Sequence, residues 1–397
     1  MKINKSRVCN VVRSKYPKTL GIRKTFQQGK INRLHSHLLS RNQAMKCEKD
    51  PAQKHDTVAP YLSKWKRYLR TATNEMEDIL KNAALYKDRT DKDALRDDMM
   101  FCYLAYGFLP SEYICFELEN KSPEERKAFV SDIDTKIFGY SVNDITVMQG
   151  IINKGKCYKN YTKFFHREGI VVEGKDDYND FLSFIKEHPV LVKKVVLSMM
   201  GRGIELVDIH KIDVPVKEYF DRLIQTGTYL LEERVIQSEA MSRFNPSSVN
   251  TIRCITLRMN NDEVVVPWCF MRTGKGGSFV DNAGSGGLLI GVNPETGDII
   301  SNGYDEYNNS YECHPDTGIR FLGERISRWD EMLAFCKAAA MEFENVSYLS
   351  WDMALTDSGW DVIEINEIGQ FIGPQTAMKK GIKKELKEYF RRMKKVV

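Results

Sequence analysis

The sequence lacks the features that mark membrane-spanning and secreted proteins. None of its segments approaches the run of about 18 apolar residues that a membrane-spanning helix needs. The N-terminal stretch MKINKSRVCNVVRSKYPKTL is basic and has no apolar core of the kind found in signal peptides. We therefore expect a cytoplasmic protein.

Paired cysteines are also lacking. The nine cysteines are odd in number and scattered, with no CxxC pair and no spacing that suits a zinc site. This pattern argues against a disulfide framework and agrees with reduced thiols in the cytosol. A convincing catalytic triad is missing as well, because Cys254 and His314 are isolated residues of types that are usually structural.

Aromatic residues are scarce near the N-terminus, where the charge is strongly positive. Residues 1–50 contain 13 Lys and Arg against two acids, with only Tyr16 and Phe26 as aromatic residues, and residues 379–397 contain nine against two. Single-strand nucleic-acid binding uses aromatic platforms, so we expect no nucleic-acid partner. Basic ends can hold phosphates or an anionic membrane surface, while a solvated, mobile tail is the simpler alternative.

Length and hydrophobic patterning divide the chain into regions. With 397 residues, 42% of them hydrophobic, the chain can form two or three domains. Residues 1–55 are polar and weakly periodic, which predicts a basic, poorly ordered arm with one helix. Residues 56–148 repeat apolar residues at steps of three and four, which predicts a helical accessory domain. Beyond about residue 150, strands are predicted in LVKKVVL, GIELVDI, TYLLEERVI, NTIRCITLRM, EVVVPWCFMR, YLSWDMAL and WDVIEINEI, and helices in DVPVKEYFDRLIQ and SRWDEMLAFCKAAAMEF.

The segment 351–370, WDMALTDSGWDVIEINEIGQ, has the pattern of a β-hairpin with the turn at DSG. With Ser358 at the centre of the turn, Asp352 lies opposite Glu364, and the alternation of side chains puts Asn366 on the same face. The opposite, apolar face contains Met353, Leu355, Ile363 and Ile365. Opposed carboxylates repel each other, so a divalent cation such as Mg²⁺ fits between them. The alternative is a solvent-exposed hairpin whose polar residues point outward.

An upstream segment, LVKKVVLSMMGRGIELVDI, has the pattern of two strands joined by a glycine loop. Lys193 or Lys194 ends the first apolar run and can supply a point charge to a phosphate. Gly201 and Gly203 allow backbone N–H groups to approach the same phosphate closely. An ordinary turn is the alternative for this short glycine pattern.

Other polar residues interrupt apolar strands. In TYLLEERVIQSEA, Glu232 and Glu233 follow an apolar run along which a nucleotide could lie, although both could be plain surface residues. Arg253 and Arg272 stand inside apolar strands, where a guanidinium needs an anion such as phosphate or carboxylate. A structural salt bridge is the alternative for each arginine.

The stretch GKGGSFVDNAGSGG is dense in glycine and bounded by strands, so it is a candidate substrate loop or, alternatively, a flexible linker. The substrate contacts that we expect from it are Asn282, Ser285, Gly286 and Gly287.

Taken in order, the lysine strand, the glycine loop, the EExxI segment, the strand arginines and the hairpin resemble the ATP-grasp enzymes. More narrowly, NPSSVNTIRCITL, VDNAGSGG, HPDTG and SWDMALTDSGWDVIEIN resemble the sugar-transfer-associated ATP-grasp family, which is found among bacterial cell-surface polysaccharide genes. GFLPSEYICFELENKSPEER is similar to the helical segment that precedes the fold in that family. The resemblance covers roughly residues 100–380.

The resemblance implies an α+β fold, the ATP-grasp fold, in which a small lobe (149–236) and a large lobe (237–397) clamp ATP together with two Mg²⁺ ions. The metal ligands that it implies are Asp352, Glu364 and Asn366. The implied nucleotide contacts are Lys156, Lys193 or Lys194, Gly201, Gly203, Glu232, Glu233, Val235 and Glu239, and Arg253 and Arg272 match arginines near the γ-phosphate and acyl phosphate. The chain departs from the family pattern where Val195 replaces the usual proline and where Gly155 replaces a common aspartate.

The chemistry implied by the resemblance is the ATP-dependent joining of a carboxylate substrate and an amine co-substrate through an acyl phosphate. A sugar acid or amino-acid group is the expected substrate, attached to a lipid- or nucleotide-linked sugar, and the basic termini could hold the protein at the inner face of the membrane. The alternatives are a small-molecule kinase on the same scaffold and a nucleotide-binding regulatory module without turnover.

Overall fold

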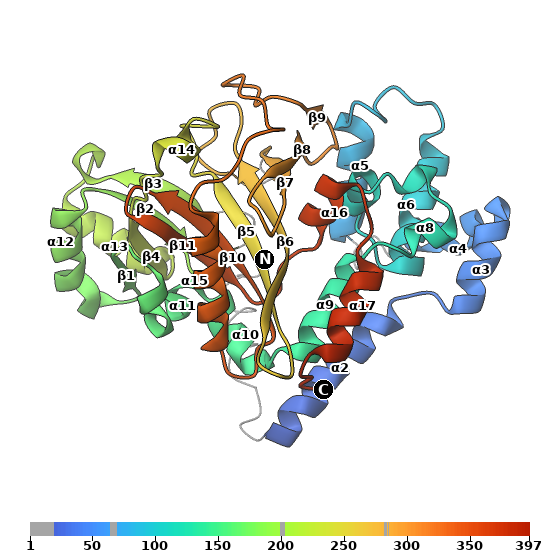
Figure 1. The fold of residues 1–397 in the computed structure, drawn as a ribbon, viewed down its shortest axis with the longest axis horizontal. Helices are drawn as coiled ribbons and strands as arrows, with labels where there is room; N and C mark the ends of the chain where they lie inside the picture. Colours follow the sequence, from blue (N-terminus) through green and yellow to red (C-terminus); the bar gives the residue numbers. More distant parts are fainter. Residues whose placement is uncertain (1–19, 64–69, 199–202, 282–283, 285) are drawn as a thin grey trace.

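The computed structural model describes residues 20–63, 70–198, 203–281, 284 and 286–397, and Figure 1 shows their arrangement. The N-terminal third of the chain is helical. Its α-helices are α2 (Leu20–Ser36), α3 (Arg41–Lys49), α4 (Pro51–Ser63), α5 (Arg70–Asn82), α6 (Lys92–Tyr106), α7 (Pro110–Cys115), α8 (Pro123–Arg126) and α9 (Asp132–Val142). Ser40, Ser122 and Ser131 cap α3, α8 and α9, because each hydroxyl accepts a hydrogen bond from a backbone N–H of the first turn.

Residues 20–49 differ from the poorly ordered arm with one helix that the sequence predicted, because they form both α2 and α3. α2 packs along α9 through polar contacts. The buried amide of Gln27 donates to the Asn143 carbonyl at 2.7 Å and accepts from the Ile145 N–H at 3.2 Å. Hydrogen bonds of this kind do not require apolar residues at regular spacing. The weak hydrophobic periodicity of this segment therefore did not reveal α2.

The small lobe contains a four-stranded antiparallel sheet with the strand order β1-β4-β2-β3. Its strands are β1 (Gly169–Val172), β2 (Val190–Val195), β3 (Ile204–Asp208) and β4 (Tyr229–Glu233). Helices α12 (Tyr178–Glu187) and α13 (Val216–Thr226) pack against the sheet, where Phe181 and Phe220 are fully buried beside Leu191 and Leu231. Two further helices, α10 (Ile145–Ile152) and α11 (Lys154–Asn160), connect this lobe to α9.

The large lobe is built on a seven-stranded antiparallel sheet with the order β11-β10-β5-β6-β7-β8-β9. Its strands are β5 (Thr251–Arg258), β6 (Val264–Thr273), β7 (Leu288–Val292), β8 (Ile299–Tyr304), β9 (Ser310–Tyr311), β10 (Tyr348–Thr356) and β11 (Gly359–Asn366). The helices of this lobe are α14 (Glu239–Ser242), α15 (Trp329–Met341), α16 (Ile372–Met378) and α17 (Lys383–Arg392). The strands and the two helices that the sequence predicted beyond residue 150 are confirmed, whereas β1, β8 and β9 were not predicted.

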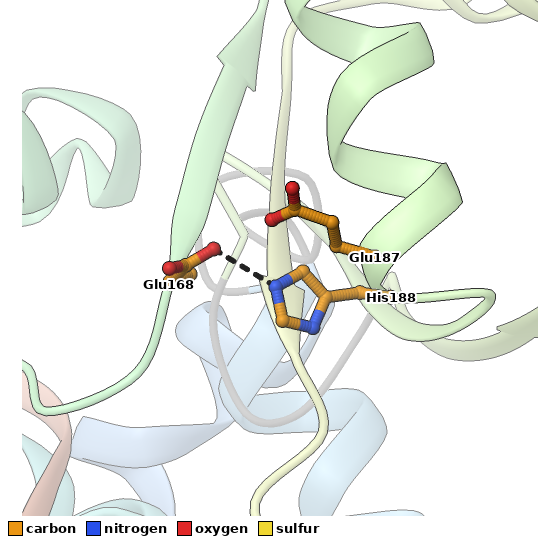
Figure 2. A group of neighbouring side chains, drawn as sticks. All are labelled: Glu168, Glu187 and His188. Atoms are coloured by element: carbon orange, nitrogen blue, oxygen red, sulfur yellow. Dashed lines mark hydrogen bonds and ion pairs between the residues drawn. The ribbon is translucent and has the colours of Figure 1, made fainter.

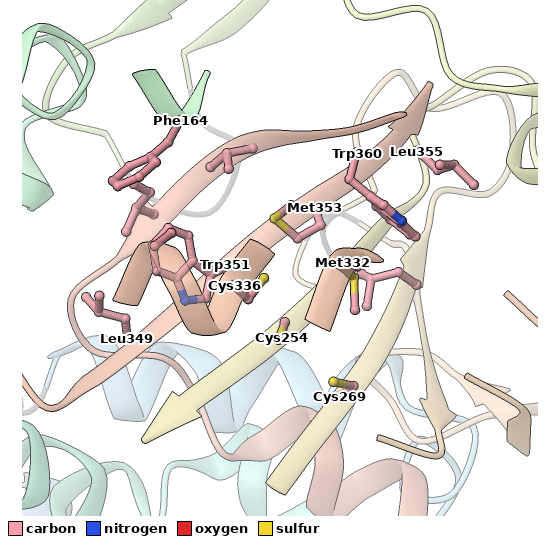
Figure 3. Close-up of a cluster of buried hydrophobic side chains, with 14 of the residues drawn as sticks. Phe164, Cys254, Cys269, Met332, Cys336, Leu349, Trp351, Met353, Leu355 and Trp360 are labelled. Carbon is pink, nitrogen blue, oxygen red and sulfur yellow. The ribbon is translucent and has the colours of Figure 1, made fainter. Parts of the chain in front are cut away.

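The main core lies between α15 and one face of the large sheet. Figure 3 shows Met332 and Cys336 of α15 against Cys254, Trp351 and Met353, all buried. The eight described cysteines are free, and all except Cys313 are buried. Arg253 and Asp352 alternate with core residues along β5 and β10 and therefore project from the opposite face. Elsewhere on that face Ile255, Trp268 and Tyr348 pack against Phe371 and Leu386 at the C-terminal helices.

No helix among the described residues combines the length and the apolar character that crossing a membrane requires.

Candidate nucleotide and metal site

A cavity of about 350 Å³ lies between the two lobes and combines an apolar part with a charged part. The apolar lining residues include Val192, Ile204, Val235, Ile236 and Phe279. The charged and polar lining residues include Lys154, Arg167, Lys194, Glu232, Glu233, Thr251, Arg272, Asp281, Asp352 and Glu364. Such a lining can hold a flat apolar ring at one end and an anionic group at the other.

Asp352 of β10 is the centre of the charged part. Its carboxylate accepts two hydrogen bonds from Arg253, with Nε to Oδ1 and Nη2 to Oδ2 both at 2.6 Å, and Arg272 Nη2 lies 2.9 Å from Oδ2. Burial alone would raise the pKa of Asp352, but the two guanidiniums outweigh burial and lower the pKa to about 2. The carboxylate therefore stays ionised at any physiological pH.

Hydrogen bonds also connect Arg272 to the start of the candidate substrate loop. Its Nε and Nη2 donate to Thr251 Oγ1 at 3.1 and 2.9 Å, and the Thr251 hydroxyl in turn donates to Asp281. The sequence alone did not single out Thr251 and Asp281, because a lone threonine and a loop aspartate carry no recognisable spacing.

Glu232 of β4 lies buried between two cations. Lys194 Nζ is 2.5 Å from Oε2, and Arg167 Nη2 is 2.5 Å from Oε1. Burial would raise the pKa of Glu232, but the charges of Arg167 and Lys194 outweigh burial and lower it. Arg167 stands just before β1 in an irregular segment, so no strand pattern marked it in the sequence.

Lys154 lines the cavity, whereas the predicted Lys156 does not. Lys154 Nζ lies 2.9 Å from Glu364 Oε1 and donates to the Ser198 carbonyl at 2.6 Å. Both lysines belong to α11, and residues two apart on a helix point about 200° away from each other. The resemblance therefore indicated the right segment, NKGKC, but the structure turns its other lysine toward the cavity.

The two candidate lysines of β2 point to opposite faces of the small sheet. Lys194 lines the cavity, while Lys193 forms an ion pair with Glu205 at 2.8 Å and lies over the ring of Tyr229. This placement follows from the two-residue period of a strand.

The predicted register of the hairpin holds at Asp352 and Glu364 and breaks beyond them toward the turn. Asp352 pairs with Glu364, as predicted, but a β-bulge follows and Met353 pairs with Val362. The bulge brings Ile363 beside Glu364 in the cavity lining, so the prediction that Ile363 lies on the apolar face is wrong. The apolar face instead presents Val362 and Ile365 to the core.

The remaining predicted site residues are divided between the lining and its surroundings. Glu233 and Val235 line the cavity, and Glu239 is exposed on α14. Gly203 has φ +72°, and an added Cβ would meet Val195 Cγ2 at 2.7 Å, so glycine is required there. Gly286 and Gly287 belong to the candidate substrate loop and are not lining residues. Gly201, Asn282 and Ser285 lie outside the described residues.

The donor set of the hairpin fits a hard cation. Glu364 is about one-third exposed to the cavity (34%), and Asn366 lies across from Ser350 on the neighbouring strand. Asn366 Nδ2 is buried and makes no hydrogen bond to any described residue, and a half-turn of the amide would bring Oδ1 into the same position. Asp352, Glu364 and Asn366 therefore offer oxygens of the kind that Mg²⁺ binds.

Another group of side chains of types that can bind a metal lies on the surface of the small lobe, where Figure 2 shows Glu168, Glu187 and His188 close together. Glu168 Oε2 is 2.9 Å from His188 Nε2, and the Glu168 side chain is 66% exposed. An ordinary surface ion pair accounts for this arrangement.

Two α+β lobes that enclose a cavity, preceded by a helical region, define an ATP-grasp fold. The model of the sugar-transfer associated ATP-grasp family matches residues 141–390, and the chain belongs to this family. The resemblance that the sequence motifs indicated is thereby confirmed.

Solved structures with a similar fold are distant in sequence. The ATP-grasp ligase PsnB with its minimal precursor shares 12% identity over 63% of each chain, with a TM-score of 0.38. The ADP complex of PurK, an N5-carboxyaminoimidazole ribonucleotide synthetase, shares 13% over 61% of this chain and 53% of its own, also with a TM-score of 0.38. The synthetase from Thermotoga maritima shares 13% over 64% and 52%, with a TM-score of 0.36. This chain thus spans between half and two-thirds of their lengths. No curated protein matches the chain.

Proposed function

We propose that the protein is an ATP-dependent carboxylate–amine ligase. The observation that carries the proposal is the cavity between the lobes, where an apolar wall adjoins the cations Lys154, Lys194 and Arg272 and the carboxylates of Asp352 and Glu364. A nucleotide matches the two parts of this cavity, because it has a flat base at one end and a polyanion at the other. Family membership supports the same assignment.

The bound nucleotide would place its base against Val192, Ile204 and Val235 and its phosphates near Lys154 and Lys194. Mg²⁺ held by Asp352, Glu364 and Asn366 would supply charge neutralisation for those phosphates. Arg272 would hold the substrate carboxylate near the terminal phosphate, since Thr251 and Asp352 fix its guanidinium. Positioning and charge therefore account for the catalysis, and no protein nucleophile is needed.

In the proposed reaction the substrate carboxylate attacks the γ-phosphorus of ATP and ADP leaves. The amine then attacks the acyl carbon, phosphate leaves with the bond electrons, and the amine proton passes to solvent. Cys254 and His314 take no part, because both side chains are buried and His314 Nε2 lies 2.8 Å from the Gly274 carbonyl. A sugar acid or amino-acid group in cell-surface polysaccharide assembly is the proposed substrate.

The test is to incubate the protein with ATP, Mg²⁺, a panel of uronic and amino acids, and hydroxylamine. An acyl phosphate reacts with hydroxylamine to give a hydroxamate, so we expect a hydroxamate together with ADP. ADP with a stable phosphate ester and no hydroxamate would identify a kinase. Nucleotide binding without ADP formation across the panel would identify a regulatory module.

We also propose that the protein works in the cytoplasm, at the inner face of the membrane. α2 contains four Lys and Arg and no acidic residue, and residues 383–397 contain seven against two. Both segments meet at the end of α9, where Gln27 donates to the Asn143 carbonyl and the Val396 N–H donates to the Ser141 carbonyl. A basic surface at this end of the molecule suits an anionic membrane that carries a lipid-linked sugar.

A further inference from the structure

Arg167 connects the two lobes through a single buried guanidinium. Its Nη1 donates to Asp361 Oδ2 at 3.0 Å and to the Val362 carbonyl at 2.5 Å, and its Nη2 donates to Glu232 Oε1 at 2.5 Å and to the Ile363 carbonyl at 3.2 Å. Three of these acceptors belong to β11 and one to β4. The Arg167 side chain is only 4% exposed, so all four bonds form away from bulk water.

The bulge in β11 creates part of this contact. Because Ile363 is the residue left over when Asp352 pairs with Glu364 and Met353 with Val362, its carbonyl is free to accept from outside the hairpin. It accepts from Arg167 and, at 3.4 Å, from Lys194 Nζ. The same two cations also share Glu232, with one carboxylate oxygen for each.

We infer that Arg167 is a positioning residue that keeps Lys194 available to the nucleotide by sharing the charge of Glu232. Without the guanidinium, the Lys194 ammonium would be the remaining cation paired with the buried Glu232 carboxylate, and a strong pair of this kind would hold it away from the phosphates. With Arg167 in place, Glu232 orients Lys194 and leaves ammonium protons for a phosphate in the cavity. This inference rests on the proposed use of the cavity by a nucleotide.

The test is a double-mutant cycle read by calorimetric titration with MgADP. Arg167→Met should weaken MgADP binding at least tenfold in the wild-type background. In the Glu232→Gln background, where no carboxylate charge remains to capture Lys194, the same substitution should weaken binding less than threefold. If Arg167 only braced the hairpin, the loss would be equal in both backgrounds, and that result would overturn the inference.

Arg126→Met is the matched control. Arg126 is also buried and pairs with a carboxylate, with Nη2 2.7 Å from Asp98 Oδ2, but it lies in the helical region. The Arg126→Met substitution should lower the unfolding temperature without changing the affinity for MgADP. Should Arg167→Met fail to fold, Arg167→Gln with Asp361→Asn replaces it in both backgrounds, because this pair leaves no unpaired charge at Asp361.

The outcomes separate the two proposals. A wild-type protein that does not bind MgADP refutes the proposed function and, with it, this inference. A wild-type protein that binds MgADP while Arg167→Met binds it equally well refutes the role of Arg167 alone.

Discussion

Asp352 illustrates how single residues set the properties of the site. Its charge is paired with Arg253 and Arg272, and a carboxyl whose folded pKa lies below its ordinary value of about 3.9 stabilises the fold above that value. This stability is lost progressively as the pH falls from the ordinary value toward about 2, the folded pKa of Asp352. Asp352 is thus a structural anion as well as a proposed metal ligand, whereas Glu364 and Asn366 have few structural contacts.

Because Glu364 and Asn366 have few structural contacts, they allow a direct test of the proposed metal site. Glu364→Gln together with Asn366→Ala should lower ADP release on the order of 100-fold or more, since hard-oxygen ligands of the cation are lost. The fold should persist, because Glu364 has one ion pair with Lys154 and Asn366 Nδ2 is unsatisfied. ADP release and the far-UV circular dichroism spectrum measure the two effects. Glu342→Gln, at an exposed ion pair with Lys163, is the control, and full turnover in the double variant would refute the metal site.

At the scale of elements, α2 is fixed to the body of the protein by Gln27. The side chain is 1% exposed and satisfies the Ile145 N–H at the start of α10 and the Asn143 carbonyl after α9. Its amide replaces the backbone partners that the first turn of a helix lacks. The helix therefore belongs to the folded protein even though its sequence is polar.

We predict that Gln27→Ala lowers the free energy of unfolding by about 1–3 kcal/mol, because a buried N–H and a buried carbonyl lose their partner. Urea denaturation followed by fluorescence measures the change. Gln28→Ala, one residue further along the same helix, removes an exposed side chain whose amide donates to Asn32 within α2, and it should change stability by less than about 0.5 kcal/mol. Equal effects of the two substitutions would show that α2 does not depend on this contact.

The elements also show how far sequence reasoning reaches. Alternation and turn chemistry were sufficient for β5, β6, β10 and β11 of the large lobe and for the pairing of Asp352 with Glu364, because both depend on local periodicity. The bulge at Ile363 and the guanidinium of Arg167 were not predictable, since they depend on contacts between β11 and a segment almost 200 residues earlier. Lys154 was missed because the orientation of α11, which no local pattern specifies, decides which lysine of NKGKC faces the cavity.

At the scale of the whole molecule, charge is separated between the ends and the body. The chain has a net charge of +5, yet residues 1–50 and 379–397 carry 22 Lys and Arg against four acids. The part of this charge on α2 and α17 gathers near the end of α9 (Figure 1), and Phe26 on α2 is 41% exposed, with Lys30 Nζ 5.6 Å from the centroid of its ring. An exposed aromatic ring beside basic side chains suits the boundary between lipid headgroups and acyl chains better than it suits a solvated surface.

We therefore predict that the protein sediments with vesicles containing phosphatidylglycerol and not with pure phosphatidylcholine vesicles, and that binding weakens as salt is added. Each basic residue near an anionic surface contributes about 1 kcal/mol. The triple variant Lys387→Glu, Arg391→Glu and Lys394→Glu changes three exposed positions on and after α17. It should thus abolish co-sedimentation while ADP release in solution stays unchanged.

The control is a second triple variant, Lys175→Glu, Lys186→Glu and Lys211→Glu, which makes the same change of charge at exposed positions of the small lobe. It should leave binding nearly intact. Equal loss in both triple variants would mean that net charge, rather than the surface of α2 and α17, drives the association.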